Sequence, residues 1–325
     1  MRHFNLKQYL PFILAIPLFG VYLSTTCPTV YLGDSGELTA AAFCLGIPHN
    51  SGYPLYALIG KIFCLIPIGN IGFRMNLMSI FFVVFTVWLV YDLTLKITSS
   101  KAASIIGALV LAFTPVFWSQ TVSAEVYSLH IFFVALLIRL LWWWDEDRGF
   151  YRLVLFAFIT GISFGNHMQT VMLAPAVFFI ILSGDKRSLL NFKHFAILSL
   201  LFIVALSIYI YLPIRTGAGA AIHWGDPDTL DRFVAHVTGS SHRRGYVFNM
   251  TPLEYLIRAR DALWDIGSQF GVMLFLSVWG WLKLESIRWR VFFVLVVFFD
   301  FSYTIFLNTI TLKGTAFNLP TCFVS

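Results

Sequence analysis

Long apolar runs constrain this chain more than any other feature of its sequence. A helix needs about 20 mostly apolar residues to cross the hydrocarbon core of a bilayer, and runs of about that length recur along the whole sequence. Of the 325 residues, 58% are hydrophobic and 12% are charged, whereas soluble domains carry about 25% charged residues. The runs are continuous rather than alternating, which favours helices over a barrel. The sequence therefore predicts an all-α, multi-pass integral membrane protein.

Nine of these runs predict membrane spans, which together form one helical transmembrane domain over residues 1–325. Gly52–Ile68 is also apolar, but Gly60, Lys61 and Pro67 interrupt it. We expect that segment to form an interfacial helix in a long first loop. The predicted spans are about 9–26, 72–95, 102–118, 126–144, 150–165, 169–183, 194–213, 267–282 and 290–309.

The distribution of Lys and Arg predicts which side of the membrane each loop faces. Cytoplasmic loops are enriched in these residues, and here they gather at alternate span ends, for example at Lys96, Arg148 and Arg187. This pattern places the N-terminus in the cytoplasm and the loops of about 27–71 and 214–266 outside. We expect a bacterial inner membrane, or the endoplasmic reticulum membrane in a eukaryote. Because the net charge of +6 arises largely in such loops, no nucleic-acid partner is expected.

The stretch YLGDSGELTAAAFCLGIPHNSGYPLY, residues 31–56, places Asp34, Glu37 and His49 just after the first predicted span. Asp34 and Glu37 have the spacing of a capping box, and the same spacing puts both carboxylates on one helix face. A partly desolvated carboxylate can accept a proton from a hydroxyl group, so both are candidate catalytic residues. They could also hold a divalent cation through oxygen ligands, although the sequence predicts no defined metal site or cofactor.

Two further turns on the predicted external side carry polar residues. Glu125, in WSQTVSAEVYS, lies at the mouth of two spans, where an acid is either a charge at a helix terminus or part of a functional site. Gln120 could line the same cavity. The turn GNHMQ places Asn166 and His167 on that side as well. We predict Glu125 as a third catalytic residue and the other three as substrate-binding residues.

Arg215 follows the seventh predicted span, within YLPIRTGAGAAIHWGDPDT. It is either an arginine that snorkels to the headgroup level or a bidentate clamp for a phosphate group. The GAGA sequence lacks the GK[ST] of a phosphate-binding loop. His223 and Trp224 could contact a sugar or a lipid headgroup. SSHRRGY, residues 240–246, is a second basic cluster, and Asn249 begins a glycosylation sequon.

Five motifs follow one another along the chain: GDSGEL with LGI-x-H-x-SGYPLY, R-x-N-L-x-S, SQ-x(4)-EVYSL, G-x-S-x-GNH, and YLPIR with HWGDP. Together they resemble a bacterial membrane-protein family of formerly unknown function, whose eukaryotic relatives are protein O-mannosyltransferases acting on IPT domains. The resemblance implies a GT-C-like helical bundle and a sugar donor linked to polyprenyl phosphate. It also implies an acidic residue early in the first external loop, which is Asp34 or Glu37 here. His49, Tyr53 and Arg74 lie in these motifs and are predicted to bind substrate.

We therefore predict a membrane glycosyltransferase that moves a sugar, with mannose as one candidate, from polyprenyl phosphate to a hydroxyl group of a protein or glycan acceptor. The reaction would take place on the non-cytoplasmic side. The alternative is a transporter or lipid-linked sugar flippase without transferase activity, which would place polar residues at mid-bilayer in an inverted repeat. A non-catalytic assembly protein would not need acids in three converging turns. The stretch LKGTAFNLPTCFVS ends the sequence where a further apolar segment begins, so we expect a piece of a longer protein.

Overall fold

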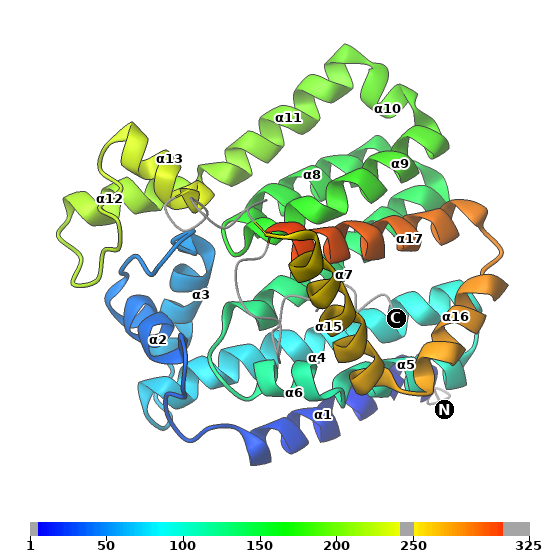
Figure 1. Ribbon diagram of the computed structural model, residues 1–325, viewed down its shortest axis with the longest axis horizontal. Coiled ribbons are helices and arrows are strands. Elements are labelled where there is room, and N and C mark those ends of the chain that lie inside the picture. The colour runs from blue at the N-terminus through cyan, green and yellow to red at the C-terminus, as the bar shows by residue number, and fades with distance from the viewer. Residues whose placement is uncertain (1–5, 241–249, 308–325) are drawn as a thin grey trace, which may run out of the picture.

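The computed structural model describes residues 6–240 and 250–307, and no β-strand occurs among them. Long helices run side by side through the body of the molecule, and four short helices gather at one end of it (Figure 1). These are α2 (Ser35–Cys44), α3 (Pro54–Cys64), α12 (Tyr211–Gly217) and α13 (Leu230–Thr238). The all-α prediction is confirmed for these residues. The SSHRRGY cluster beyond Ser240, the sequon at Asn249 and the apolar C-terminal stretch lie outside them.

Five helical segments of the described chain are long and apolar enough to cross a membrane. Two of them are single helices, and the other three contain a 3-10 or π-helical step. They are α4 (Ile71–Thr98), α7 (Val126–Asp147), η1 with α9 (Met168–Leu173 and Ala174–Asp185), α11 with η2 and α12 (Phe192–Leu206, Ser207–Ile210 and Tyr211–Gly217), and α17 with η3 (Ile287–Ser302 and Tyr303–Leu307). A one-turn helix, α10 (Arg187–Leu190), links α9 to α11.

Two further helix pairs would bring the number of spans to seven if each pair crosses as one bent unit. α5 (Lys101–Ala112) and α6 (Pro115–Thr121) meet at 67°, because Pro115 can begin a helix but cannot continue one. α15 (Pro252–Phe270) and α16 (Met273–Lys283) meet at 94°, where Gly271 adopts a positive φ of 51°. The third and eighth predicted spans are therefore bent or shortened.

The remaining two predicted spans correspond to α1 (Leu6–Thr25) and α8 (Phe150–Phe164). α8 has 15 residues, so it is about 22 Å long and shorter than the hydrocarbon core of a bilayer, which is about 30 Å thick. Residues 14–25 form the described apolar part of α1. By length and composition the structure supports five to seven spans, and nine stays a prediction. The side of the membrane that each end faces stays a prediction as well.

One predicted boundary is wrong. The seventh span does not end at Pro213 but continues to Gly217, after a 3-10 step at Ser207–Ile210. Proline has no N–H to donate to the carbonyl four residues earlier, so the helix tightens there instead of stopping. Among its described residues, the predicted external loop 214–266 contains α13 and most of α15, helices that the sequence analysis did not predict.

The first long loop carries two short helices, as expected. α3 has 11 residues, too few to cross a bilayer, and its location at the membrane interface stays a prediction. Pro54 begins α3 at a position that tolerates proline. α2 and α3 pack against α4 and α7 through a buried apolar cluster that includes Leu38, Tyr56, Met75 and Leu129. This packing fixes the end of α2 that carries Asp34 against the start of α7.

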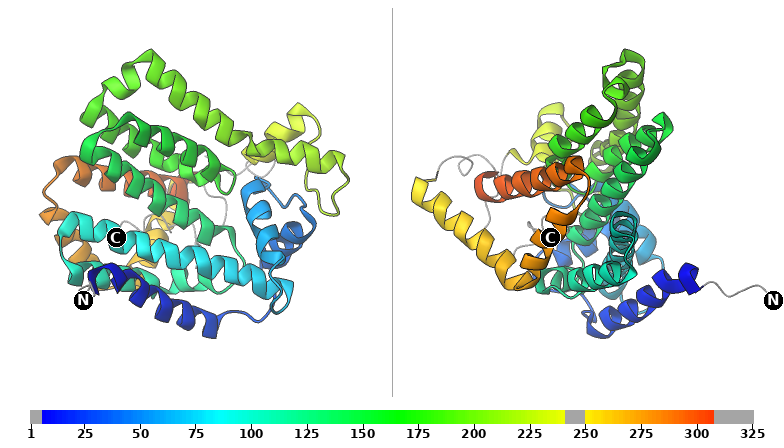
Figure 2. Two further views of the ribbon diagram at one scale, coloured as in Figure 1. Left: turned by 180° about the vertical axis from the view of Figure 1, so that it is seen from behind. Right: turned by 90° about the vertical axis from the view of Figure 1, so that its right-hand side faces the viewer.

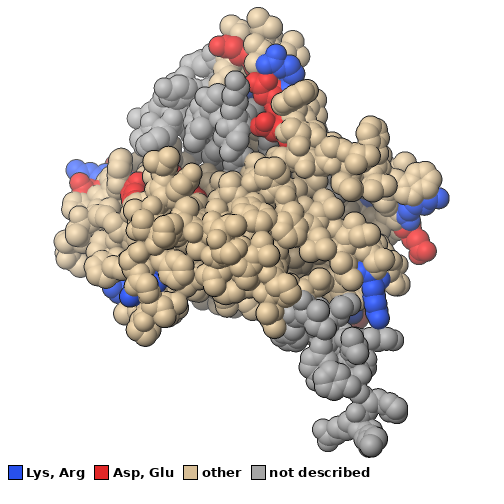
Figure 3. Space-filling model, turned by 90° about the horizontal axis from the view of Figure 1, so that it is seen from below, with Lys and Arg blue, Asp and Glu red and all other residues tan. Residues whose placement is uncertain are grey.

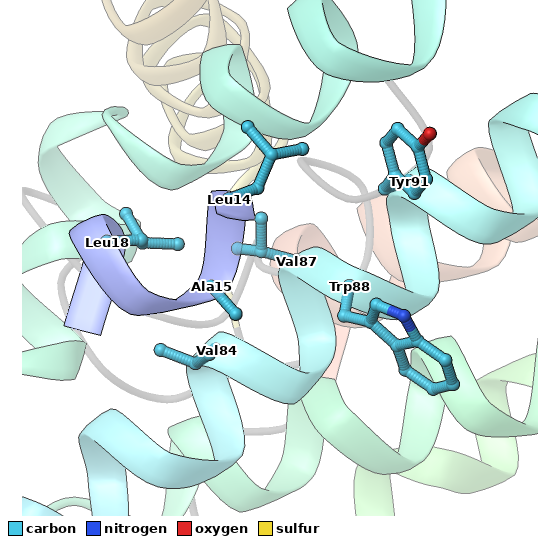
Figure 4. A pocket seen from close by; sticks show the side chains of 7 residues that line it. All are labelled: Leu14, Ala15, Leu18, Val84, Val87, Trp88 and Tyr91. Atoms are coloured by element: carbon cyan, nitrogen blue, oxygen red, sulfur yellow. The ribbon is translucent and has the colours of Figure 1, made fainter. Parts of the chain in front are cut away.

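Charged side chains are scarce between the ends of the bundle. The centre of the face seen in Figure 3 shows no Lys, Arg, Asp or Glu, and these residues lie toward its margins. Figure 2 shows α15 lying across the long helices on one side of the molecule. An apolar pocket lies between α1 and α4 (Figure 4), and it contains none of the polar residues singled out above. Its lining residues are Leu14, Ala15, Leu18, Val84, Val87, Trp88 and Tyr91.

Candidate functional site

Asp34, Glu37 and His49 come together at the start of α2. Gly33, with a positive φ of 74°, turns the chain into this helix. The helix ends at Leu45, which adopts the left-handed conformation. Ile47 then pairs with the backbone of the loop before α13: its N–H donates to Ile222 O at 2.7 Å. This turn brings His49 back to the first turn of α2, where one ligand atom from each of the three residues lies within 4.8 Å of the others.

The capping-box explanation for this stretch is wrong. Asp34 occupies the N-cap position but its side chain makes no capping hydrogen bond. Glu37 faces His49 instead: its Oε1 accepts the backbone N–H of His49 at 2.7 Å, and its Oε2 lies 3.2 Å from Nδ1 of the ring. Ser35 accepts a hydrogen bond from the N–H of Tyr31 at 3.1 Å. The two carboxylates are therefore available for a purpose other than helix capping.

His49 lies between the two carboxylates. Its Nε2 is 3.6 Å from Asp34 Oδ2 and 3.4 Å from the hydroxyl of Tyr53. The Asp34 side chain is 56% exposed, whereas those of Glu37 and His49 are 24% and 26% exposed. A substrate could therefore reach Asp34 directly. The three residues could also hold a divalent cation through two carboxylate oxygens and one imidazole nitrogen, a ligand set suited to Mn²⁺ or Zn²⁺.

Glu125 joins this group from the start of α7. A methyl group added to Gly33 would contact Glu125 Oε1 at 3.9 Å, which places the Glu125 carboxylate beside the turn that leads into Asp34. Glu125 is the N-cap residue of α7 but makes no side-chain capping bond. Burial, and to a lesser extent the nearby Asp34 carboxylate, raise the pKa of Glu125 to about 8. We refer to Asp34, Glu37, His49 and Glu125 as the carboxylate cluster.

Aromatic and histidine rings form a wall behind the cluster. Tyr53 has a φ of 38°, a left-handed conformation that is strained for a residue with a large side chain. Its ring meets His49 edge-on at 5.3 Å between centroids and stacks on His167 at 6.2 Å. His167 also contacts Tyr127 at 5.6 Å and His130 at 4.8 Å. Burial, followed by the nearby His49, lowers the pKa of His167 to about 4, so its ring is neutral at neutral pH.

Asn166 and Gln169 fix the turn that carries His167. The Asn166 side chain is fully buried and donates from Nδ2 to Val126 O at 3.1 Å, which ties the turn to the start of α7. Gln169 donates from Nε2 to Asp300 Oδ1 at 2.8 Å, which ties it to α17. The hydrogen bond from Asn166 Nδ2 to Val126 O therefore has a structural role. The Asn166 Oδ1 has no partner within the described part of the chain, so it could still accept a hydrogen bond from a substrate.

The sequence analysis missed two buried polar residues near this wall. His130 is 1% exposed, and neither ring nitrogen has a hydrogen-bond partner among the described residues. Asp300, also 1% exposed, accepts the bond from Gln169. Both lie inside apolar runs. The mean hydropathy of such a run stays high even when it contains one polar residue, so neither residue was noticed. An acid inside a predicted span is a functional candidate by default, so Asp300 could have been singled out.

The structure gives other predicted residues contacts outside the cluster. Arg215 donates from Nε to Leu45 O at 2.7 Å and from Nη2 to Cys44 O at 3.3 Å, so it holds the C-terminus of α2. Since α2 has 10 residues, its ends are about 15 Å apart. Arg74 donates to Cys64 O at 2.7 Å, with further bonds to Ile68 O and Gly69 O, and so holds the end of α3.

Three more predicted residues also lie outside the cluster. Gln120 has a buried Oε1 with no hydrogen-bond partner in residues 6–240 and 250–307. His223 pairs with Asp226, its Nδ1 lying 2.5 Å from Oδ1. Trp224 is 51% exposed, and its backbone N–H donates to Ile47 O at 3.1 Å. His223 and Trp224 therefore lie in the loop before α13, whose backbone pairs with Ile47 on the turn that leads to His49. The described cysteines, Cys27, Cys44 and Cys64, form no disulfide.

Comparison with known proteins gives one family and two relatives. Residues 34–190 match the family described as protein O-mannosyl-transferase TMEM260 N-terminal domain, a range that begins at Asp34 and includes the whole carboxylate cluster. The chain is 32% identical over 214 residues to the protein O-mannosyl-transferase TMEM260 of Mus musculus, a match that covers 63% of this chain and 30% of the mouse protein. It is 26% identical over 325 residues to the protein O-mannosyl-transferase tmem260 of Dictyostelium discoideum, covering 89% of this chain and 39% of that protein.

The chain thus spans 30% and 39% of the length of these two relatives. Arg215, His223 and Trp224 lie beyond the matched domain. No solved structure matches the chain significantly.

Proposed function

Because the chain is related to the protein O-mannosyl-transferases of the TMEM260 family, we propose that it is a membrane glycosyltransferase. The donor is a sugar, with mannose as the first candidate, linked to polyprenyl phosphate. The acceptor is a hydroxyl group of a protein or glycan, and the fold is a GT-C-like helical bundle. The reaction takes place on the non-cytoplasmic side, which the Lys and Arg distribution assigns to the end with the carboxylate cluster.

The observation that carries this proposal is the composition of the carboxylate cluster. It gathers three carboxylates from two separate segments, and among the described residues no Lys or Arg forms an ion pair with any of them. Like charges held close together in a partly buried site are costly. Such an arrangement is typical of a site in which carboxylates exchange protons with a substrate.

The environments of the carboxylates support separate roles for them. Of the two carboxylates that contact His49, Asp34 is the more exposed. We assign it as the general base that removes the proton of the acceptor hydroxyl. Glu125, whose pKa is raised to about 8, is mostly protonated at neutral pH. It can therefore donate a hydrogen bond to a sugar or phosphate oxygen, which an ionised carboxylate cannot do.

The surrounding residues then shape the substrate site. Tyr53 and His167 present rings beside Asp34 and His49, and a sugar can pack its apolar face on such rings. Asn166 and Gln120 each have a buried side-chain oxygen that accepts no hydrogen bond from the described residues. His223, Trp224 and Arg74 are assigned to substrate binding from the motifs alone. Arg215 stays a candidate for the donor phosphate, although its guanidinium now bonds the carbonyls at the end of α2.

One observation favours the alternative of a transporter or lipid-linked sugar flippase. Arg139 and Asp92 form an ion pair with 2.5 Å between Nε and Oδ2, and both lie within membrane-spanning helices. Ionisable residues inside spans are frequent along transport pathways. The carboxylate cluster, in contrast, lies at the ends of helices, where a lipid-linked donor presents its phosphate and sugar.

A reconstituted assay separates the two functions. The protein in nanodiscs receives polyprenyl-phosphate mannose and a peptide that contains Ser and Thr. Mass spectrometry then follows mannosylated peptide and free polyprenyl phosphate. The proposal expects donor cleavage, with the sugar transferred to the peptide or to water. Movement of intact donor between the leaflets of a vesicle, without cleavage in either assay, would favour the flippase.

A further inference from the structure

We propose that His167 donates a hydrogen bond from Nε2 to a hydroxyl group of the donor sugar, and that Gln169 and Asp300 position it for this contact. The inference rests on the proposed function and deepens it, because it names the group of the donor that the site recognises. It also gives a role to Asp300, which is 1% exposed within the apolar helix α17. A carboxylate is costly in such surroundings unless it is hydrogen-bonded, and it is a functional candidate there.

The backbone of η1 determines which ring nitrogen of His167 carries the hydrogen. His167 is the N-cap residue of η1, and its Nδ1 accepts the backbone N–H of Gln169 at 3.3 Å. A ring nitrogen that accepts a hydrogen bond carries no hydrogen of its own, so we assign the hydrogen of the neutral ring to Nε2. Because Nδ1 is turned toward the backbone of η1, Nε2 lies at the outer edge of the ring. His167 therefore offers a hydrogen-bond donor at that edge.

This donor is available to a substrate. Among the described residues none accepts a hydrogen bond from His167 Nε2, although the ring of His130 lies only 4.8 Å away. His167 is 8% exposed, so its ring is not fully sealed. The ring stacks on Tyr53 at 6.2 Å between centroids, and Tyr53 meets His49 of the carboxylate cluster at 5.3 Å. A substrate bound beside the cluster therefore lies along this row of rings.

The charge of the surroundings favours the sugar over the phosphate as the partner of His167. Asp34 and Glu37 carry carboxylates, and no Lys or Arg among the described residues forms an ion pair with them. A phosphate held beside these groups would be repelled, whereas the sugar carries no charge. Its hydroxyl oxygens can accept a hydrogen bond, and its apolar face can pack on the ring of Tyr53.

Two contacts hold the turn that carries His167. Asn166 anchors the turn to α7 through its bond to Val126 O. Gln169 donates from its side-chain nitrogen to Asp300 Oδ1 at 2.8 Å, which anchors the turn to α17. Gln169 thus binds α17 with its side chain and His167 Nδ1 with its backbone N–H. Asp300 acts on His167 through Gln169, so it is a positioning residue.

Deoxygenated donors test the contact that His167 makes. The protein in nanodiscs cleaves polyprenyl-phosphate mannose and its monodeoxy analogues, one for each free hydroxyl group of the sugar. His167→Asn is the matched variant, because asparagine keeps an oxygen that can cap η1, but its shorter side chain places no donor at the Nε2 position. In the wild type, at least one analogue should raise the Michaelis constant by roughly 2- to 10-fold, the effect of losing one neutral hydrogen bond. In His167→Asn the intact donor should already show this increase, and the same analogue should add nothing.

A second set of variants tests the positioning role of Asp300. Gln169→Leu combined with Asp300→Leu removes their hydrogen bond from both sides, so no charge is left unpaired in the bundle. We expect this double variant to lose the preference for the same hydroxyl group, whereas Asp300→Asn keeps an acceptor oxygen and should retain it. Asp145→Asn is the control, because it breaks an anchor at the other end of α17. It should lower the melting temperature and leave the preference unchanged.

A structural role for His167 would not single out one hydroxyl group. Equal changes for every analogue in the wild type and in His167→Asn would therefore overturn the proposal. A preference that is lost in His167→Asn but kept in the double variant would overturn the role of Asp300. If the double variant does not fold, Gln169→Met with Asp300→Asn replaces it, since both side chains are then neutral and the side-chain donor at position 169 is gone. If the wild type cleaves none of these donors, the proposed function fails, and this inference fails with it.

Discussion

The two ends of the helical bundle treat their acidic residues in opposite ways. At one end, which we call the arginine end, Asp145 and Asp147 are both paired with guanidinium groups. Arg288 Nη2 lies 3.0 Å from Asp145 Oδ1, Trp289 Nε1 donates to Asp145 Oδ2 at 2.9 Å, and Arg152 Nη2 lies 2.5 Å from Asp147 Oδ2. At the other end, the carboxylate cluster has a single histidine as its ion-pair partner among the described residues.

This difference separates residues that hold the fold together from residues that serve chemistry. A carboxylate with an arginine partner contributes to the stability of the fold, and its ion pair opposes protonation. A carboxylate held near other carboxylates destabilises the folded state. Such a cost persists where function requires it. Substitutions at the arginine end should therefore lower stability, and substitutions of catalytic residues in the carboxylate cluster should lower turnover.

Asp34→Asn should have the largest effect, and the effect should be on turnover. We expect kcat for sugar transfer to fall by roughly 10²- to 10⁴-fold, the usual contribution of acid–base catalysis. The melting temperature should stay close to that of the wild type, because Asp34 makes no capping bond that the substitution could remove. Asp228→Asn is the matched control, an exposed acid with an arginine partner, and should transfer sugar normally. Near-normal turnover in Asp34→Asn would move the base to Glu125.

Glu125→Gln should change how stability depends on pH. The folded-state pKa of about 8 exceeds the ordinary value of 4.5, so the folded wild type loses stability as the pH rises from about 4.5 to about 8. The full difference is about 5 kcal/mol by linkage. Glutamine has no charge to bury, so the variant should melt at a higher temperature than the wild type at pH 9 and at a similar one at pH 4. Parallel melting curves across this range would show that Glu125 is solvated.

Asp145→Asn should reverse the pattern of Asp34→Asn. Its side chain is 13% exposed, and the substitution leaves the Arg288 guanidinium without its ionised partner. Breaking a buried pair on one side costs about 3–5 kcal/mol, so the melting temperature should fall by several degrees. Turnover per folded molecule should be unchanged. A loss of turnover without a loss of stability would show that the arginine end also takes part in the reaction.

Arg215→Ala should have the smallest effect of the four, and it tests which role this arginine has. Its guanidinium bonds two carbonyls at the end of α2, and loss of charged hydrogen bonds costs about 1.5–3 kcal/mol. We therefore expect a lower melting temperature, and if these bonds are the only role of Arg215, the Michaelis constant for the donor is unchanged. Arg232→Ala removes only an exposed pair and serves as the control. An increase in that Michaelis constant without loss of stability would instead support the phosphate contact predicted from the sequence.

Much of the fold was predictable because it depends on local sequence. Apolar runs predict helices directly. The bends at Pro115 and Gly271 were not predicted, although each lies at a residue that interrupts a helix. The continuation past Pro213 was not predicted, because a proline in a helix either ends it or distorts it, and the packing of the surrounding helices decides which. The helices within 214–266 were missed because they are amphipathic and carry several charges.

In the candidate site, too, the residues were predictable from local sequence, but their long-range contacts were not. Asp34, Glu37, Glu125 and His49 were all singled out from the sequence, and the structure brings them together. Whether Glu37 caps α2 or holds His49 depended on the return of the chain twelve residues later, which the capping pattern cannot show. The contact of Arg215 with Leu45 joins residues 170 positions apart. His130 was hidden in an apolar helix and became visible only once its ring was found against His167.

Photoaffinity labelling tests the contrast between the two ends most directly. A polyprenyl-phosphate sugar with a diazirine on the sugar ring is bound to the protein in nanodiscs, irradiated, and mapped by mass spectrometry after proteolysis. The account predicts labelled peptides within residues 31–56 or 118–127, with the label removed by an excess of unmodified donor. Competed labelling confined to the arginine end, within residues 143–152 or 283–290, would contradict it.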